Sequence, residues 1–458
     1  YTPPSDCPRP WAKVVLAADW SVDAGRQFDR TAVIWLGGTN IYLGTTAEPS
    51  SSVARSWHTE SDLTDYTPLF AAAQDGRVDL GNLVNTTYTS HLHGSAILQF
   101  YPLPSHGKAN MTPTADAVFP MASDATGGTV ALNSGTDQLS KTFALPTNIE
   151  QVYLDVLAQS QSSDEFWYSC SPDEVASELF GNCGSTAFRE SEITIDGQPA
   201  GVAPVYPWIY TGGIDPYFWR PTPGIHTLNF EPYRVDLTPF AGVLSDGQPH
   251  QVALSVYNAH SYFSATATLL VYLDKGSSHV SGGVTKNTLA ADPNLQIQEN
   301  LTNTNGDIYG TVNTTAGRSF LISGFVQTSH GRVDTTVLQK IGFKNNQPWV
   351  VTPSYISQGV TQLASISSLT TTKSGWQTRT AFRSQSWPLT MNLSYTFDPS
   401  GNITQQGAVQ QILTRNELQT WNGVPVYLSR LCETVQTQDT LLFNSAFQVT
   451  GNQGSKSQ

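Results

Sequence analysis

The sequence predicts an all-β protein, and three observations support this fold class. Charged residues make up only 13% of the 458 residues, while Ser, Thr, Asn, Gln, Gly and aromatic residues are abundant, a balance that suits pleated strands with hydroxyl-bearing outer faces. Apolar and polar residues alternate in short runs separated by turn-forming residues. Signals for helix starts are rare. Because the chain is too long for one ordinary core, we expect two or three domains.

The first third predicts an N-terminal β-sandwich over residues 1–110. Trp11 to Trp20 and Thr31 to Leu36 have the composition of strands, and Gly37-Gly38 ends the second of them. Tyr88 to Tyr101 predicts a further strand.

A second β-sandwich is expected over residues 141–278. Residues 111–140, which precede it, are rich in Ala, Ser, Thr, Gly and Pro without clear periodicity, as is typical of a linker or a long surface loop. The segment from Ser171 to Phe180, with acids in its first turn, is the one short helix predicted. The strands predicted here are Gln151–Leu157, Glu192–Ile195, Gln251–Tyr257 and Thr266–Leu273.

Residues 279–458 predict a C-terminal antiparallel β domain. Thr-, Ser- and Gln-rich runs alternate with apolar residues, and no fixed-period repeat is found. Turns between its strands are expected at Asn305-Gly306, Asn345-Asn346 and Ser400-Gly401.

The charge balance excludes one class of partner. Asp plus Glu outnumber Lys plus Arg by 36 to 23, a formal net charge of -13, and nucleic-acid binding depends on Lys and Arg to neutralise phosphates. No apolar stretch is long enough to cross a bilayer, so no membrane contact is expected either. Because the chain starts at Tyr1 without an initiator Met, we expect a processed, soluble product.

Sequons and cysteines predict a secreted protein, extracellular or vacuolar. Six Asn-X-Ser/Thr sequons without Pro are dense for this length. The predicted glycosylation sites are Asn85, Asn110, Asn300, Asn313, Asn392 and Asn402. The four cysteines have no zinc-like spacing, so disulfides are expected. Cys170 with Cys183 would close a short loop, and by elimination Cys7 with Cys432 would tie the start of the chain to its end.

The string Asp164-Glu165-Phe166-Trp167-Tyr168 combines two acids with three aromatic rings. Carboxylates can transfer protons and aromatic rings can stack on sugar faces, so the string favours glycan chemistry. The alternative is a strand end that carries acids and aromatics for solubility and packing alone.

Asp29 opens an apolar strand that runs to Trp35. On an extended strand it shares a face with Thr31 and Val33, so an acid begins a stripe that otherwise packs inward. Burial would raise its pKa and the adjacent Arg30 would lower it, and either effect suits a proton-transfer residue. A structural Asp-Arg pair that holds a loop is the alternative.

Two later segments also carry charge and aromatic rings. Phe188-Arg189-Glu190 leads into a strand, and the loop of residues 210–221 contains a double glycine and prolines that would fix Trp219 and Arg220. Arg220 could bind an oxyanion or sugar hydroxyls, and Trp219 could stack on a pyranose. A rigid turn anchored by a buried Trp and an ion pair is the alternative.

His91 and His93 lie two residues apart on one strand face, a geometry that a metal could use. No third ligand follows a known zinc spacing and HExxH is absent, so no metal or other cofactor is expected. The chain also lacks a Gly-rich phosphate loop, a GxSxG elbow and a reactive Cys-His pair, which disfavours nucleophilic triads.

Several of these strings occur together in one family. The chain resembles the acidic plant and fungal peptide:N-glycosidases, the PNGase A family, in collinear order from about Tyr1 to Lys275. The matching strings are Pro4–Cys7, Gly25–Arg30, Trp35–Gly38, Thr46–Pro49, Asp62–Tyr66, Asp164–Tyr168, Phe188–Glu190, Tyr210–Gly213, Trp219–Pro221 and Leu237–Phe240.

The resemblance implies a glycoamidase that hydrolyses the amide bond between Asn and the innermost GlcNAc of N-glycans, giving aspartate and a glycosylamine. It implies two packed jelly-roll-like sandwiches with the site at their interface, an acidic working range and no metal. The implied partner is an N-glycosylated peptide. Because family members have sequence upstream of Pro4, a separate N-terminal fragment of the same precursor is a further expected partner.

The resemblance also assigns roles. Phe28-Asp29-Arg30 matches the Trp-Asp-Arg string that carries the catalytic Asp of distantly related bacterial enzymes, whereas their two assisting glutamates have no counterpart in this sequence. The expected catalytic residues are therefore Asp29 with Glu165 or Glu190, chosen on chemistry. Arg30 or Arg220 would offset an oxyanion. The expected substrate-binding residues are Arg30, Glu48, His93, Asp164, Trp167, Tyr168, Arg189, Trp219 and Arg220.

Two other functions are consistent with the same residues. A glycoside hydrolase acting on N-glycans would also use paired carboxylates and aromatic stacking. A non-catalytic, lectin-like β-sandwich would retain Trp167, Tyr168 and Trp219 but would have no need of Asp29.

Overall fold

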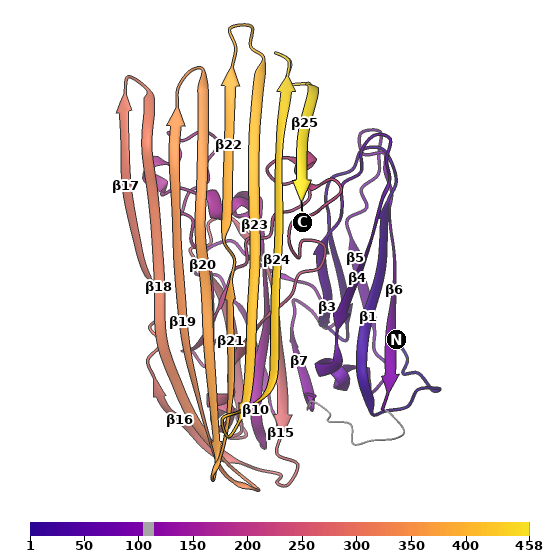
Figure 1. Ribbon diagram of the computed structural model, residues 1–458. Coiled ribbons are helices and arrows are strands. Elements are labelled where there is room, and N and C mark those ends of the chain that lie inside the picture. The colour runs from indigo at the N-terminus through magenta and orange to yellow at the C-terminus, as the bar shows by residue number, and fades with distance from the viewer. Residues whose placement is uncertain (104–113, 458) are drawn as a thin grey trace.

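Antiparallel strands are the main element of the protein, which confirms the all-β prediction (Figure 1). The computed structural model describes residues 1–103 and 114–457. Its strands form an N-terminal sandwich, a second sandwich and one large sheet of long strands.

The N-terminal sandwich consists of two three-stranded sheets, in the orders β4-β1-β6 and β3-β2-β5. Its strands are β1 (Trp11–Val22), β2 (Thr31–Leu36), β3 (Thr39–Thr45), β4 (Arg55–Asp62), β5 (Gly76–Leu80) and β6 (Leu92–Pro102). The two sheets enclose a core that includes Trp11, Trp20, Ile34 and Phe70. The apolar alternation of β1 and β2 therefore faces a true interior.

The second sandwich also consists of two sheets, in the orders β13-β10-β15-β7, with β8 on β15, and β12-β11-β14-β9. Its strands are β7 (Ala117–Met121), β8 (Val130–Leu132), β9 (Leu139–Ala144), β10 (Ile149–Gln161), β11 (Glu190–Ile195), β12 (Gln198–Pro204), β13 (Tyr233–Asp236), β14 (Pro249–Tyr257) and β15 (Tyr262–Leu273).

The prediction of a linker or long loop at residues 111–140 is wrong, because part of this segment forms strands. Residues 117–121 and 130–132 within it are β7 and β8, and both pair with β15. These strands are short and are surrounded by Gly, Ser and Thr, so their period-2 pattern is too brief to detect in sequence.

The helices are all short. They are η1 (Thr64–Phe70), η2 (Ser162–Ser169), α1 (Asp173–Ala176), η3 (Pro216–Trp219), η4 (Thr238–Phe240) and α2 (Ala241–Leu244). The helix predicted from Ser171 to Phe180 contains α1 but reaches only four residues. In the described part of the chain, none of the helices is long and apolar enough to span a membrane.

The C-terminal region forms one ten-stranded antiparallel sheet. Its strands are β16 (Ser281–Asn287), β17 (Asn294–Thr304), β18 (Asp307–Thr328), β19 (Gly331–Val351), β20 (Tyr355–Ser374), β21 (Gln377–Ser386), β22 (Leu389–Phe397), β23 (Ile403–Trp421), β24 (Val424–Phe443) and β25 (Val449–Ser457). The strands β21 and β22 both lie between β20 and β23 and are interrupted at Trp387-Pro388.

The turn predicted at Asn345-Asn346 is wrong, because both residues lie inside β19. Asn345 is buried on the inner face of the sheet, where its side-chain amide donates to the carbonyl of Tyr168 at 2.9 Å and to Gln362 Oε1 at 3.2 Å. Two adjacent asparagines usually mark a turn, but here one of them holds the sheet to the second sandwich.

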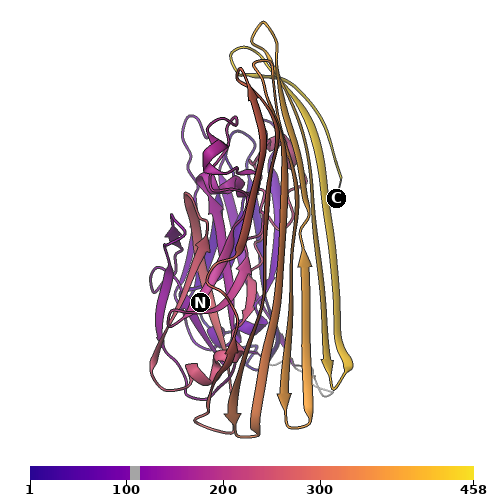
Figure 2. The same ribbon diagram turned by 90° about the vertical axis from the view of Figure 1, so that its left-hand side faces the viewer.

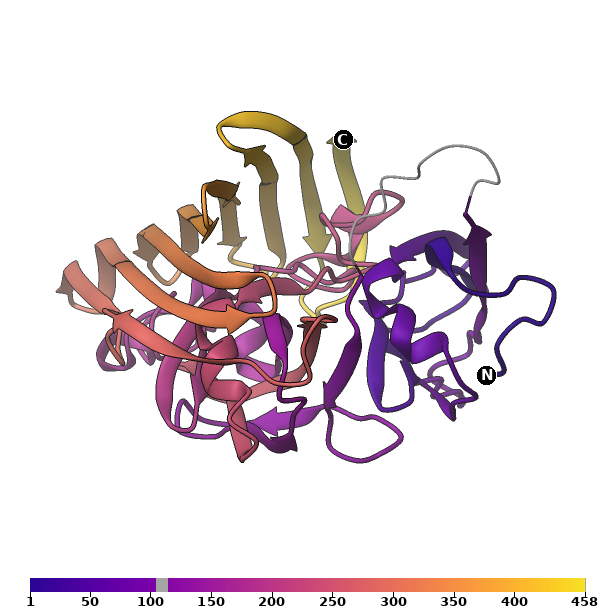
Figure 3. The ribbon, with the colours of Figure 1, turned by 90° about the horizontal axis from the view of Figure 1, so that it is seen from below.

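The N-terminal sandwich, the second sandwich and the large sheet, which we call the three bodies, are joined by clusters of buried residues. The large sheet covers one side of the second sandwich and extends past its upper end (Figure 2), and buried residues of both form one continuous cluster. Seen from below, the N-terminal sandwich lies beside the second sandwich (Figure 3). A separate cluster joins these two sandwiches and includes Val33, Trp35, Leu43, Trp208 and Phe230. The junction between the sandwiches is therefore rigidly packed.

Candidate active site

The segment Gln27–Arg30, between β1 and β2, is held in one conformation by its backbone amides. The amide of Phe28 donates to Gln27 Oε1 at 3.1 Å, that of Asp29 to Glu48 Oε1 at 3.3 Å and that of Arg30 to Thr46 Oγ1 at 2.9 Å. The Gln27 side chain is buried and donates in turn to the carbonyls of Leu83 and Ser90. These contacts place Asp29 beside the end of β3.

A long loop from the second sandwich docks on the same strand end. Tyr42 Oη donates to the carbonyl of Leu228 at 2.6 Å, and the amide of Thr45 donates to the carbonyl of Thr227 at 2.9 Å. Thr211 Oγ1 donates to the carbonyl of Thr46 at 2.6 Å. The loop therefore crosses the junction, and Gly212 lies against the carboxylates of the N-terminal sandwich.

Gly212 is the contact point of two acids. A Cβ atom added there would lie 2.6 Å from both Asp29 Oδ1 and Glu48 Oε1. The backbone of Gly212 and the Glu48 side chain both act on the Asp29 carboxyl group to lower its pKa. Glu48 also accepts from Arg220 at 2.8 Å through its other oxygen. The absence of a side chain at position 212 thus allows the two carboxyl groups to meet.

Glu165 joins this cluster from the second sandwich. It lies on η2, which directly follows β10, and a Cβ atom at Gly213 would lie 3.6 Å from Glu165 Oε1. Gln159 near the end of β10 donates to Thr31 Oγ1 at 3.1 Å, which ties this strand to β2. Asp29, Glu48 and Glu165 therefore surround the Gly212-Gly213 turn, and we call them the carboxylate cluster.

The three carboxyl groups of the cluster differ in the charges and hydrogen bonds that shift their pKa values. Burial raises the pKa of Asp29, while hydrogen bonds from Gly212 and Glu48 and the charge of Arg30 partly oppose this rise. Burial and then the charge of Asp29 raise the pKa of Glu48 to about 7, against the effect of Arg220. The same two causes raise the pKa of Glu165 to about 7. At mildly acidic pH the cluster can therefore hold one carboxylate and two neutral acids.

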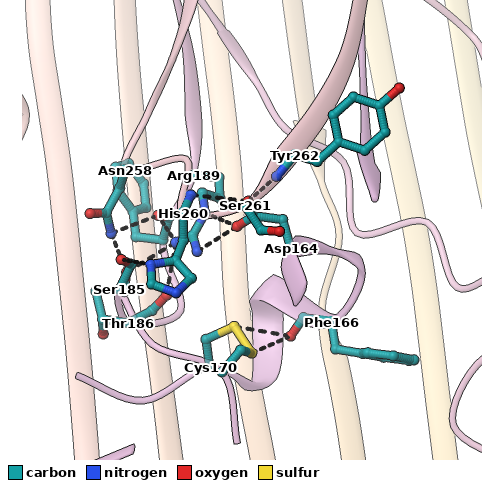
Figure 4. A network of polar contacts seen from close by, with 12 residues as sticks. Asp164, Phe166, Cys170, Ser185, Thr186, Arg189, Asn258, His260, Ser261 and Tyr262 are labelled. Carbon is teal, nitrogen blue, oxygen red and sulfur yellow. Dashed lines mark hydrogen bonds and ion pairs between the residues drawn. A yellow bond between two sulfur atoms is a disulfide. The ribbon is translucent and has the colours of Figure 1, made fainter. Parts of the chain in front are cut away.

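The substrate-binding role predicted for Asp164 and Arg189 does not fit the structure. Both side chains are fully buried and paired at 2.7 Å. Asp164 Oδ2 also accepts the backbone amides of His260, Ser261 and Tyr262 (Figure 4). All the polar capacity of this carboxylate is used inside the protein, so it positions η2, and with it Glu165, without reaching a ligand.

The disulfide between Cys170 and Cys183 is confirmed and lies beside this network (Figure 4). The second predicted disulfide is wrong. Cys7 and Cys432 are free; Cys7 packs near the carbonyl of Phe100 in the N-terminal sandwich, while Cys432 is exposed on β24. They belong to different bodies of the fold, so pairing by elimination joined two unrelated positions.

The three aromatic side chains expected to stack on sugars are almost completely buried, which corrects the prediction for Trp167 and Tyr168. Trp167, Tyr168 and Trp219 are 1%, 1% and 3% exposed and belong to the shared core. The indole N–H of Trp219 donates to the carbonyl of Gly213 at 2.8 Å. The Trp219 ring therefore supports the Gly213 end of the turn and contributes to the lining of the pocket described below, whereas Trp167 and Tyr168 offer no open face for stacking.

Glu190, predicted as an alternative catalytic acid, lies elsewhere. It is buried on β11, and Arg318 of β18 pairs with it at 2.7 Å. Burial raises its pKa to about 7, and the charges that act on it are those of Arg318 and Glu192, not Asp29. The elevated pKa of Glu190 reflects the packing between the second sandwich and the large sheet. The structure therefore does not support the catalytic role predicted for Glu190.

His93 and Arg30 lie outside the carboxylate cluster. His93 is exposed on β6 and lies 3.2 Å from Asp23. The Arg30 guanidinium donates to Gln27 Oε1 at 2.9 Å. Their predicted contacts with substrate stay predictions. Among the described residues, one group could offer three ligand atoms to a metal, namely Glu150, Asp274 and His330, and it involves none of the carboxylate cluster.

A pocket of about 250 Å³ opens on the Arg220 side of the cluster. Its lining residues neighbour Glu48, Gly212 and Arg220 in sequence. They are Ala47, Ala54, Arg55, Ser56, Trp57, Thr211, Trp219, Pro221, Pro223 and Leu228. The pocket is smaller than the roughly 300–1,000 Å³ typical of sites for drug-sized ligands, and so it suits one small ring.

Comparison with known proteins identifies the family. Residues 1–290 match the family model described as peptide N-acetyl-beta-D-glucosaminyl asparaginase amidase A. The chain belongs to the PNGase A family. This confirms the resemblance read from the sequence strings, and the matched residues include the whole carboxylate cluster.

A curated member of the PNGase A family is similar over most of this chain. Peptide-N4-(N-acetyl-beta-glucosaminyl)asparagine amidase A of Prunus dulcis is 32% identical over 368 residues, which cover 76% of this chain and 62% of the relative. The chain therefore spans less than two thirds of that relative's length.

Among solved structures, PNGase F of Flavobacterium meningosepticum has 13% identity and a TM-score of 0.34, with coverage of 58% of this chain and 87% of the other. PNGF-II has 10% identity and a TM-score of 0.37, with 58% and 59% covered.

Sequence reasoning missed the importance of Gly212. The Tyr210–Gly213 string was noted for its backbone freedom, whereas the structure uses Gly212 for its lack of a side chain. A glycine in a string shared with the PNGase A family was the available signal.

Proposed function

We propose that this protein is a peptide:N-glycosidase, which hydrolyses the amide bond between an asparagine side chain and the innermost GlcNAc of an N-glycan. The observation that carries this proposal is the meeting of Asp29, Glu48 and Glu165 around Gly212-Gly213. Membership in the PNGase A family supports the same reaction.

The charge states of the cluster suit hydrolysis of an amide at acidic pH. An ionised Asp29 can accept a proton from the water that attacks the side-chain carbonyl. Glu165, neutral below its pKa of about 7, can donate a proton to the departing nitrogen. Water adds its oxygen to the carbonyl carbon, the C–N bond breaks, and a carboxylic acid and a glycosylamine are released.

Glu48 has a supporting role in this scheme. Neutral below its pKa of about 7, it donates a hydrogen bond to the Asp29 carboxylate and so fixes the orientation of that group. Arg220 holds the other Glu48 oxygen at 2.8 Å. Such a network keeps the base within the narrow geometric tolerance that proton transfer requires.

The pocket beside Arg220 is our candidate site for the innermost sugar. It borders the cluster, its size suits one ring, and the polar residues Thr211 and Ser56 are part of its lining. A concave site with a few polar groups is the usual form of a small-ligand pocket.

Isotope incorporation tests the reaction. A glycopeptide digested in heavy-oxygen water at acidic pH with chelator should yield a peptide in which labelled aspartate replaces the glycosylated asparagine. The Asp29→Asn variant should be inactive under the same conditions with nearly unchanged melting. Label on the sugar with asparagine retained would instead reveal a glycoside hydrolase, and intact substrate would indicate a binding protein. Either result contradicts the proposal.

We also propose passage through a secretory route. Asn85, Asn300, Asn392 and Asn402 are exposed and Asn313 is partly exposed. Asn110 lies outside the described residues. A disulfide suits an oxidising compartment. Protein expressed in a secretory host should carry N-glycans, measured by mass on the Asp29→Asn variant so that it cannot remove its own. Unmodified sequons in that host would refute this route.

A further inference from the structure

We infer that Arg26, Phe28, Arg30 and Tyr88 form a subsite for the peptide on either side of the glycosylated asparagine, with a preference for acidic side chains. This inference rests on the proposed function. We call these four residues the aromatic platform. It is distinct from the pocket that suits the sugar, and it adjoins Asp29 directly in the sequence.

The platform is built by contacts among its members. The Phe28 and Tyr88 rings lie 4.8 Å apart between centroids. The guanidinium of Arg26 lies 6.0 Å from the Phe28 ring and 5.8 Å from the Tyr88 ring. That of Arg30 lies 5.7 Å and 5.5 Å from the same two rings. Two cations thus share two aromatic rings, an arrangement that holds both guanidinium groups at defined positions.

The backbone beneath the platform is rigid. Arg26 and Thr89 are joined by an amide-to-carbonyl hydrogen bond at 2.9 Å, and the amide of Arg26 donates to Thr89 Oγ1 at 3.3 Å. Gln27 fixes the amide of Phe28 and accepts from the Arg30 side chain. Even so, the Phe28 ring is 42% exposed. A ring held outward on an immobile backbone pays little entropy on binding, which favours a recognition role.

The surroundings favour a peptide as the occupant. Leu83 and Val84, which precede Tyr88 in the same loop, are 52% and 37% exposed. Together with Phe28 they present apolar surface next to the reacting carboxylates, and such surface beside polar groups marks interaction sites. An exposed, partly apolar surface outside the pocket suits an extended peptide better than a small sugar ring.

The order of contacts across the site places the peptide on this side. Phe28 adjoins Asp29, Asp29 contacts Glu48, and Glu48 contacts Arg220, beside which the pocket opens. The sugar and the peptide leave the scissile amide in opposite directions. If the ring occupies the pocket, the peptide must extend over the platform.

The charges explain the preference for acids. The chain has a net charge of -13, which would repel acidic peptides. Within residues 1–103 and 114–457, neither Arg26 nor Arg30 forms an ion pair with a carboxylate of the chain. Two such cations next to the site can attract an acidic side chain that flanks the asparagine.

Paired glycopeptides test the inference. Two substrates with one glycan and either Glu or Lys beside the asparagine should differ in kcat/KM by about two- to fivefold, the range of an exposed ion pair, in favour of Glu. Arg26→Glu should reverse the preference. High salt should reduce it in the wild type. Arg9→Glu is the matched control, because Arg9 is also exposed and lies over an aromatic ring, that of Trp11, at the other end of β1.

A second measurement separates peptide from sugar. Phe28→Leu and Tyr88→Leu should raise KM for the glycopeptide while inhibition by free chitobiose stays unchanged. Weaker chitobiose inhibition in either variant would make the platform a sugar subsite and overturn the inference. A Glu/Lys ratio of one in an active wild type, or a ratio that Arg26→Glu does not alter, would overturn it too. Absence of any amide cleavage by the wild type would instead refute the proposed function.

Discussion

Replacing Gly212 with alanine should impair catalysis while leaving the fold intact. The new Cβ would lie 2.6 Å from both Asp29 Oδ1 and Glu48 Oε1, whereas real Cβ contacts are essentially never shorter than 3.0 Å. Each oxygen must therefore move by at least 0.4 Å, and by 0.8 Å to reach ordinary contact at 3.4 Å.

The expected loss follows from the tolerance of the site. Catalytic groups must stay within about 0.5 Å of their productive positions, and a misplacement of about 1 Å costs on the order of 10²-fold in rate. We therefore expect kcat/KM to fall about 10²-fold, equivalent to about 2.7 kcal/mol of transition-state stabilisation. Stability should change little, because Gly212 does not adopt a positive φ and the obstructed atoms are ends of side chains.

The assay is release of aspartate-containing peptide from a defined glycopeptide, with melting measured in parallel. Gly283→Ala on β16 is the matched control, because a Cβ there would meet nothing within 4 Å, and it should retain full activity. A folded Gly212→Ala protein with kcat/KM within about twofold of the wild type would refute the reasoning, because the carboxylates would then tolerate displacement or have no role in the reaction.

Three further predictions concern the acids and the disulfide. Glu165→Gln should lower kcat by about 10²-fold or more with little change in melting temperature. Glu190→Gln should instead lower the free energy of unfolding by about 3 kcal/mol, because it breaks the buried pair with Arg318, and should leave kcat nearly unchanged. The reverse pattern would exchange the roles of the two acids. Activity should fall above about pH 7 as Glu165 loses its proton, and at low pH as Asp29, whose pKa is raised, gains one; an alkaline limb unaltered in Glu165→Gln would exclude Glu165 as the acid. Replacing Cys170 and Cys183 with serine opens a loop with a sequence separation of 13. The free energy of unfolding should fall by about 3 kcal/mol, measured as a lower denaturant midpoint. An unchanged midpoint would mean that the network around Asp164 alone fixes this region.

Sequence by itself determined the fold class and named Asp29 as a candidate site residue. Apolar residues that alternate with Thr and Ser do not form the apolar stripe of a helix, and they are too apolar for a disordered chain. Strands such as β1 and β2 were therefore predictable from the local pattern. Asp29 was identifiable because an acid at the head of an inward-facing stripe is costly unless it is used. The short disulfide followed from two cysteines close in sequence. These features depend on neighbouring residues, which the sequence displays directly.

Only the tertiary structure decided which acids lie together. Glu48 and Glu190 are buried and Glu165 is partly buried, and the pKa of each is raised to about 7, yet only Glu48 and Glu165 lie near Asp29. Their difference depends on how two sandwiches and a sheet pack, which brings residues far apart in sequence to one turn.

The same limit applies to the aromatic rings. Trp167 and Tyr168 are aromatic residues of the kind that stack on sugars, but they are core residues, whereas the less conspicuous Phe28 is 42% exposed. Side chains on a strand or loop read alike in sequence whichever way they face, because exposure is set by long-range packing rather than by local propensity. The sequence therefore supplies the chemistry, and the packing of the three bodies selects which residues can perform it.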